Sequence, residues 1–163
     1  MEKLSVHVRD SRLKRQFDAP LERATPGSAG YDLRATSYRT NSGRLHPLHE
    51  PIRLFPGGTQ LFGTGISMLI ADPMYVGIIA SRSGLYAKHG IRVGQGVGTI
   101  DSDYTGEIFV PLHNEGDAPY EIQPLERIAQ LTFQTVGHPT IELVDSLDTT
   151  ERGDGGFGHS GTV

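Results

Sequence analysis

The residues best suited to chemistry in this 163-residue chain lie in short stretches rich in glycine, serine, arginine and aspartate. Residues 152–161 place an arginine, a phenylalanine and a serine among glycines. Arginine offers a fork-shaped donor for phosphate, glycine N–H groups can surround an anion, and a phenylalanine ring can stack on an aromatic ligand. These residue types predict a tail that closes over a phosphorylated, aromatic ligand; the alternative is a plain flexible terminus.

Two further stretches carry residues that could hold phosphate or activate water. In residues 81–85, Arg82 and Ser83 precede an expected short helix, whose first N–H groups can seat a phosphate. Ser83 would serve equally well as a simple helix cap. In residues 98–107, Asp101 and Asp103 are two positions apart, so only one of them faces a given pocket if the segment is extended. Both could instead be turn formers at the end of a hairpin.

Short strands must position these residues, because apolar side chains alternate or cluster over short lengths. The segments that favour strands are residues 4–8, 68–71, 76–80, 108–112 and 129–133. Clusters of proline, glycine, asparagine and aspartate separate them, which is typical of a sandwich or barrel. Residues 85–89 form the one stretch that favours a helix, and the polar residues 38–50 are expected to form a surface excursion. We therefore predict an all-β fold.

Composition excludes several classes of protein. With 21 glycines and 10 prolines, both of which interrupt helices, a helical bundle is disfavoured. The absence of cysteine excludes disulfide scaffolds, cysteine nucleophiles and thiolate zinc sites. A net charge of -4 provides no basic field for nucleic acid. The charged N-terminus and the short apolar runs argue against a signal peptide or membrane span, so we expect a cytoplasmic or host-cell intracellular protein.

Five stretches, taken together and in order, resemble the motifs of the dUTPase family. They are AGYDLRA (29–35), RSGL (82–85), GTIDSDYTGE (98–107), RIAQL (127–131) and RGDGGFGHSG (152–161). The resemblance spans residues 26–161. It implies a β-jelly roll with one short helix, with residues 1–145 as the body and 146–163 as a flexible glycine-rich arm of the same domain. It also implies a homotrimer in which each active site is shared among the chains.

The resemblance further implies hydrolysis of dUTP to dUMP and pyrophosphate with Mg2+ on the triphosphate, which would keep uracil out of DNA and supply dUMP for dTMP synthesis. Asp101 would be the general base that activates water for attack on the α-phosphorus, a role that can supply roughly 10²–10⁴-fold in rate. Asp32 would support the metal through water. The residues that would hold the phosphates are Arg82, Ser83, Gly84 and Gln130.

The same resemblance assigns residues to the nucleoside and to the tail. Tyr104 would pack on the deoxyribose and reject a 2′-hydroxyl, while Gln95, Thr99 and Ile100 would recognise uracil. From the tail, Arg152 would neutralise the γ-phosphate and Phe157 would stack on the base. The residues that would close around the phosphates are Gly158, His159 and Ser160. Two positions depart from the usual family pattern: Gln95 stands where many relatives have asparagine, and His159-Ser160 replaces Ser-Thr.

Two other functions stay open at this point. A dCTP deaminase would share the fold and the trimer, but its pattern requires a proton-transferring glutamate where the alignment places Pro111. A non-catalytic jelly-roll protein could bind nucleotide to regulate a partner, with residues 38–50 as a contact region. An intact Asp101 favours the hydrolase, because a pure binding protein needs no general base. A metal site at His46 and His49 is disfavoured, because their proline-bearing loop offers no further ligands.

Overall fold

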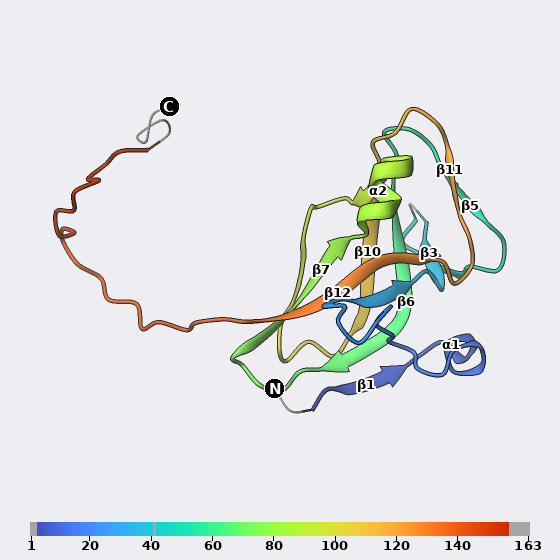
Figure 1. The fold of residues 1–163 in the computed structure, drawn as a ribbon, viewed down its shortest axis with the longest axis horizontal. Coiled ribbons are helices and arrows are strands. Elements are labelled where there is room, and N and C mark those ends of the chain that lie inside the picture. The colour runs from blue at the N-terminus through green and yellow to red at the C-terminus, as the bar shows by residue number, and fades with distance from the viewer. Residues whose placement is uncertain (1–2, 41, 157–163) are drawn as a thin grey trace.

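The computed structural model describes residues 3–40 and 42–156 and consists mainly of β-strands (Figure 1). The strands are β1 (Ser5–Val8), β2 (Tyr31–Arg34), β3 (Ser37–Arg39), β4 (Leu45–Pro47), β5 (Ile52–Leu54), β6 (Thr59–Leu69), β7 (Tyr75–Ser81), β8 (Ile91–Val93), β9 (Gly98–Ile100), β10 (Glu107–Asn114), β11 (Tyr120–Ile122) and β12 (Arg127–Thr135). The helices in this part are α1 (Ser11–Gln16) and α2 (Ser83–His89). The expected all-β class is confirmed. No helix in the described ranges is long and apolar enough to cross a membrane.

The strands form two larger sheets and one small sheet. The six-stranded sheet has the order β4-β3-β6-β10-β8, with β1 paired to the other half of β6. The four-stranded sheet has the order β2-β12-β7-β9, and β11 pairs with β5. Neighbouring strands in these sheets run antiparallel. In such sheets one face can pack on the core while the other meets solvent.

One hydrophobic core fills the space between these sheets. Along β10, buried and half-buried residues alternate strictly, so that Ile108, Val110 and Leu112 point inward. Phe62 on β6 and Leu131 on β12 are also fully buried in this core. Because successive side chains of a strand point to opposite faces, this alternation fixes which face of each sheet meets solvent.

The strands expected at residues 4–8, 76–80, 108–112 and 129–133 are present, but residues 68–71 are only the end of the long strand β6, which stops at Leu69 and leaves Ala71 exposed with φ +64°. The chain has a second short helix, α1, in addition to α2 at the expected place. Asp10 caps α1 by accepting the N–H of Arg12, and Leu13 is the buried residue of the helix. Six residues are too few to show helical periodicity, so only the cap and Leu13 could have signalled this helix.

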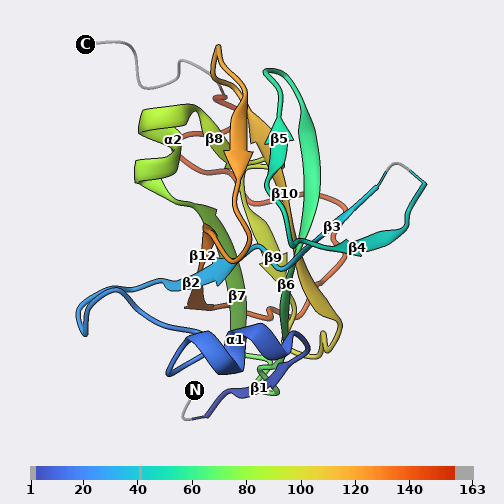
Figure 2. The ribbon, with the colours of Figure 1, turned by 90° about the vertical axis from the view of Figure 1, so that its right-hand side faces the viewer.

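The expected surface excursion at residues 38–50 is largely a β-hairpin. Strands β3 and β4 pair with each other and extend from the body (Figure 2). The Tyr38 and His46 rings stack with centroids 5.5 Å apart. Leu48, just beyond the hairpin, is fully buried, and its carbonyl accepts a hydrogen bond from Arg12. The excursion is therefore anchored in the core at its C-terminal end.

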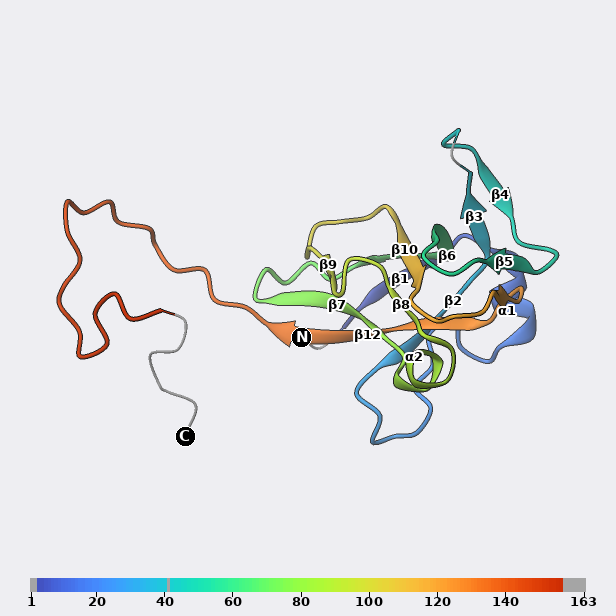
Figure 3. The same cartoon turned by 90° about the horizontal axis from the view of Figure 1, so that it is seen from above.

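The chain leaves the body after β12. Val136 N still donates to Met74 O, and His138 Nε2 lies 2.7 Å from Pro73 O. From there the segment extends away from the sheets (Figures 1 and 3), and residues 139–154 are exposed. The division into a body of residues 1–145 and an arm of residues 146–163 stays a prediction.

Candidate active site

A pocket of about 230 Å³ lies between β9 and β10, beside the expected general base. Its lining includes five residues singled out from the sequence: Gln95, Thr99, Ile100, Asp101 and Tyr104. The neighbouring Ile79, Ile108 and Phe109 add apolar walls. A small pocket with an apolar wall and a few polar groups suits one flat ring or sugar.

A tight turn presents Asp101 to this pocket. Tyr104 N donates to Asp101 O at 3.2 Å, so Asp101 starts a turn and the interpretation of an extended segment was wrong. Ala71 N binds the Ser102 carbonyl at 3.0 Å, which ties the turn to the corner after β6. Gly106 follows the turn. A side chain does not fit at this position, because a Cβ there would lie 2.4 Å from the Tyr104 hydroxyl. Asp101 is exposed and contributes to the lining of the pocket.

The turn that connects β8 to β9 forms the other wall; the two strands belong to different sheets and do not pair with each other. Gly96 has φ +83°, and its N–H donates to Val93 O at 3.0 Å. Gly94 N donates to Pro111 O at 2.7 Å, which fastens the turn to β10. Pro111 is therefore a strand residue that accepts a main-chain hydrogen bond. The exposed Gln95 lies at the tip, where its amide has both donor and acceptor groups.

A second cluster, which contains arginines, lies where β7 meets α2. Asp32 Oδ1 lies 3.4 Å from Arg82 Nε, and Asp32 Oδ2 lies 3.1 Å from Arg127 Nη1. Arg82 also donates to the Arg127 carbonyl at 2.8 Å. Burial lowers the pKa of Arg34, and the charge of Arg127 lowers it further, which reflects how closely the arginines lie. Arg82 and Arg127 on one partly buried carboxylate, with Arg34 nearby, leave net positive charge for an anion.

Local structure explains how this cluster is assembled. The pairing of β12 with β2 slips by one residue between Arg127 and Ala129, a bulge of the kind that re-aims side chains near active sites. Arg82 occupies the cap position of α2, so Ser83 is the first helical residue and not the cap. Ser83 and Gly84 are exposed, so their main-chain groups are accessible.

Gln130 lies beside the same arginines. Its Nε2 donates to the Ser81 carbonyl at 3.0 Å. A Cβ on Gly30 would lie 2.7 Å from Gln130 Oε1, which explains the glycine in the stretch 29–35. The first, second and fourth of the recognised stretches therefore meet in one cluster, here called the arginine cluster (Asp32, Arg82, Arg127, Gln130).

The pocket and the arginine cluster do not meet within one chain. Ile100 pairs with Gly77 near the start of β7, whereas Arg82 follows the last residue of that strand. Five residues at about 3.3 Å each place Asp101 and Arg82 roughly 17 Å apart along β7. The three phosphates of a triphosphate are linked directly through shared oxygen atoms. A triphosphate is therefore too short to contact both Asp101 and Arg82 of a single chain closely.

Comparison with known proteins gives the same assignment along the whole chain. A family model described as dUTPase matches residues 18–161. The deoxyuridine 5'-triphosphate nucleotidohydrolase of Tolumonas auensis is 47% identical over 161 residues, which is 99% of either chain. That of Enterobacter sp. is 46% identical and covers 99% of this chain and 98% of its own. This chain belongs to the dUTPase family.

Solved structures of dUTPases share the fold. The Staphylococcus bacteriophage 80alpha dUTPase with dUpNHpp has a TM-score of 0.78 at 24% identity and covers 99% of either chain. The dUTPase of phage phi11 of S. aureus has a TM-score of 0.71 at 20% identity. The relatives are named nucleotidohydrolases, so the expectation of a dUTP diphosphatase is confirmed and the deaminase is not supported.

Asp32 was expected to support Mg2+ through water, and its surroundings fit that indirect role. The described ranges contain no group of three or more histidine, aspartate or glutamate side chains that could hold a metal ion. Mg2+ often uses one or two carboxylates together with substrate phosphates and keeps several waters. Asp32 is a single carboxylate, 15% exposed and next to the arginines. One carboxylate cannot form an all-protein cage, and both of its oxygens face arginines, so Asp32 would reach Mg2+ only through water and only when the nucleotide brings the ion.

Of the expected tail residues, the structure describes Arg152. Arg152 is exposed, and its Nε donates to Gly155 O at 2.7 Å within a local turn. The predictions for Phe157, Gly158, His159 and Ser160 lie outside the described residues. Sequence reasoning missed the roles of Arg127 and Glu107 in building the two clusters. Both residues lie in stretches that resemble family motifs. Only the tertiary structure shows that Arg127 contacts Asp32 and that Glu107 contacts Gly65.

Proposed function

We propose that this chain hydrolyses dUTP to dUMP and pyrophosphate with Asp101 as the general base. Asp101 would take a proton from a water molecule whose oxygen forms a bond to the α-phosphorus. The bond from that phosphorus to the bridging oxygen breaks, and pyrophosphate leaves with the electron pair. The observation that carries the proposal is an exposed aspartate in the lining of a pocket that Gln95, Thr99 and Tyr104 also line.

The arginine cluster would supply the electrostatic part of catalysis. Phosphoryl transfer depends mainly on alignment and on neutralisation of charge. Arg82 and the accessible main chain of Ser83 and Gly84 would bind the phosphates, with Gln130 at their side. Bound Mg2+, held by water to Asp32, would neutralise further charge on the triphosphate.

The base-binding pocket accounts for the preference for deoxyuridine. Main-chain groups of Thr99 and Ile100, with the Gln95 amide, would pair with uracil. The Tyr104 ring would pack on the sugar and leave no space for a 2′-hydroxyl. The solved 80alpha phage dUTPase carries dUpNHpp, an analogue with the same nucleoside, which supports this substrate class.

We also propose a homotrimer in which Asp101 of one chain meets Arg82 of another. The separation of these groups along β7 supports a shared site. The exposed segment after β12 supports association as well: Ile141 is 85% and Leu143 is 96% exposed. Apolar residues so exposed commonly mark a contact with another chain. The tail, with Arg152 and the stretch 157–160, would then close over a neighbouring site.

Pyrophosphate release from the eight common nucleoside triphosphates tests the proposal. We expect release from dUTP in the presence of Mg2+, with UTP, dCTP and dTTP far slower. Sedimentation of the same sample should give three times the mass of one chain. Equal rates with UTP and dUTP would contradict the assigned pocket, and no release from any nucleotide would contradict the activity.

A further inference from the structure

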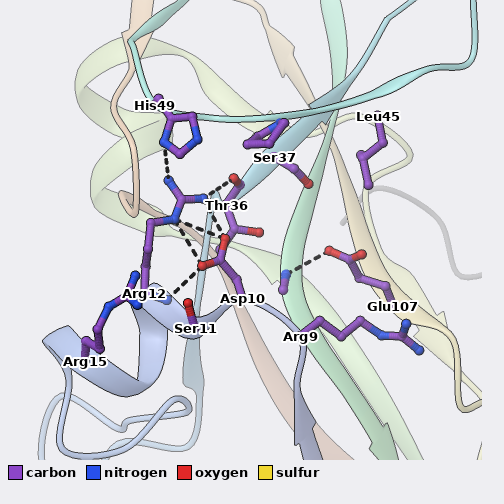
Figure 4. A pocket seen from close by; sticks show the side chains of 12 residues that line it. Arg9, Asp10, Ser11, Arg12, Arg15, Thr36, Ser37, Leu45, His49 and Glu107 are labelled. Atoms are coloured by element: carbon purple, nitrogen blue, oxygen red, sulfur yellow. Dashed lines mark hydrogen bonds and ion pairs between the residues drawn. The ribbon is translucent and has the colours of Figure 1, made fainter.

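Glu107 holds the turn that carries Asp101 and Tyr104 through two different groups. Its carbonyl accepts the Tyr104 hydroxyl at 2.8 Å, and its side-chain Oε1 accepts the Gly65 N–H at 2.8 Å. Glu107 also lines both the pocket beside Asp101 and a cavity of about 640 Å³ between α1 and the β3–β4 hairpin (Figure 4). One residue therefore links the candidate active site to the cavity beside α1.

The partner of this side chain is a rigid peptide. Gly65 is buried and has φ +67°. The pairing of β10 with β6 shifts there, from Glu107 opposite Ser67 to Phe109 opposite Gly63. A Cβ on Gly65 would lie 2.8 Å from the Cβ of Asp10, so no other residue fits without movement. The irregularity in β6 thus turns a main-chain N–H toward the Glu107 carboxylate.

The N-terminal segment holds Gly65 through its other main-chain group. Arg9 N donates to Gly65 O at 2.7 Å. The Arg9 guanidinium binds Ser67 Oγ, and its Nη2 lies 3.5 Å from the Thr105 carbonyl. Gly65 therefore has little freedom, and a side chain bound to it is held in one place.

We propose that Glu107 is a positioning residue that sets the orientation of the Tyr104 ring and thereby the rejection of ribonucleotides. The chain of contacts runs from Gly65 N–H to the Glu107 carboxylate, and from the Glu107 carbonyl to the Tyr104 hydroxyl. Without the first contact, the strand end that carries the carbonyl can shift and the ring moves with it. This inference rests on the proposed function, which gives Tyr104 its role against the 2′-hydroxyl.

The test is the ratio of kcat/KM for dUTP to kcat/KM for UTP in Mg2+. Glu107→Ala removes the acceptor of the Gly65 N–H and should lower this ratio about tenfold or more, since small displacements at a reacting site have large effects. Glu107→Gln keeps an oxygen acceptor on a side chain of the same length and should retain the wild-type ratio.

The control is Glu121→Ala. It removes a strand glutamate from an exposed ion pair with Arg53 in the small sheet and should leave the ratio unchanged. A merely structural loss would lower Tm without a change in the ratio.

Tyr104→Phe breaks the second contact and leaves Gly65 and Glu107 untouched, so it carries the test even where Glu107→Ala does not fold. We expect a lower ratio in this variant, and in the double variant no further fall, because the two contacts act in series. A wild-type ratio in Tyr104→Phe, or additive effects in the double variant, overturns the inference. The proposed function fails separately, when the wild-type protein releases no pyrophosphate from dUTP.

Discussion

Two inactive variants of this protein should restore each other's activity when their subunits are mixed. Asp101 and Arg82 lie near opposite ends of β7, so a site that needs both must take them from different chains. Asp101→Asn removes the proposed base from one set of chains, and Arg82→Ala removes the proposed phosphate ligand from the other. In the proposed trimer, neither variant alone has an intact site.

The size of the recovery follows from random assembly. At equal amounts, position 101 of a given site is intact in half of the trimers, and position 82 in half. With the two positions on different chains, about one site in four is intact, so about a quarter of wild-type activity should return. A site formed within one chain would recover nothing, because each chain carries one of the two substitutions.

The assay is pyrophosphate release after the two purified variants are unfolded in urea together and refolded. Native mass spectrometry of chains with tags of different mass verifies that mixed trimers have formed. As a matched control, Asp101→Asn is mixed with a chain that carries both substitutions, a mixture in which position 101 is never intact. Mixed trimers with no more activity than this control would refute the argument from β7.

Three further predictions concern single positions and segments. Asp101→Asn should lower kcat by about 10²–10⁴-fold and leave the affinity for dUpNHpp, measured by calorimetry, nearly unchanged; a large loss of affinity would contradict its role as a base. Burial raises the pKa of Asp10, but hydrogen bonds and charge from Arg12 outweigh this and hold it below 3.8. That contribution to stability is present above pH 3.8 and is lost as pH falls through the folded pKa, so Asp10→Asn should flatten the acid side of a plot of Tm against pH, and an unchanged acid side would contradict this role of the Arg12 contacts. Truncation before Arg152 should abolish most activity and leave Tm nearly unchanged, because residues 152–154 are exposed; a large fall in Tm would show that the segment supports the body.

Sequence patterns predicted β1, β7, β10 and β12, because a strand that buries one face carries apolar residues at regular positions; the short strands β2 to β5, β8, β9 and β11 and most of β6 were not predicted. The alternation at residues 108–112 and 129–133 follows directly from side chains that point to opposite faces. Helix α1 escaped prediction because six residues with one buried leucine carry almost no periodic signal. The hairpin at β3 and β4 escaped because its polar composition resembles that of a loop, and only its pairing with β6 makes it part of a sheet.

The sequence predicted the continuous part of the candidate site but not the contacts between distant segments. The stretch around Asp101 is continuous in sequence, so its residues necessarily lie close to one another in the pocket. The contacts of Arg127 with Asp32 and of Glu107 with Gly65 join residues 95 and 42 positions apart. No local pattern encodes such contacts, because they depend on how β12 lies on β2 and how β10 lies on β6.

By itself, the sequence determined the class of fold and the residue types available for chemistry: short amphipathic strands, glycines where the backbone must turn tightly, and carboxylates and arginines suited to phosphate. Only the tertiary structure decided which of these groups face one another. It separated Asp101 from Arg82 by nearly the length of β7 and surrounded Asp32 with arginines. The physical reason is that side-chain identity is local, whereas distance in a β-sheet protein is set by strand pairing between segments far apart along the chain.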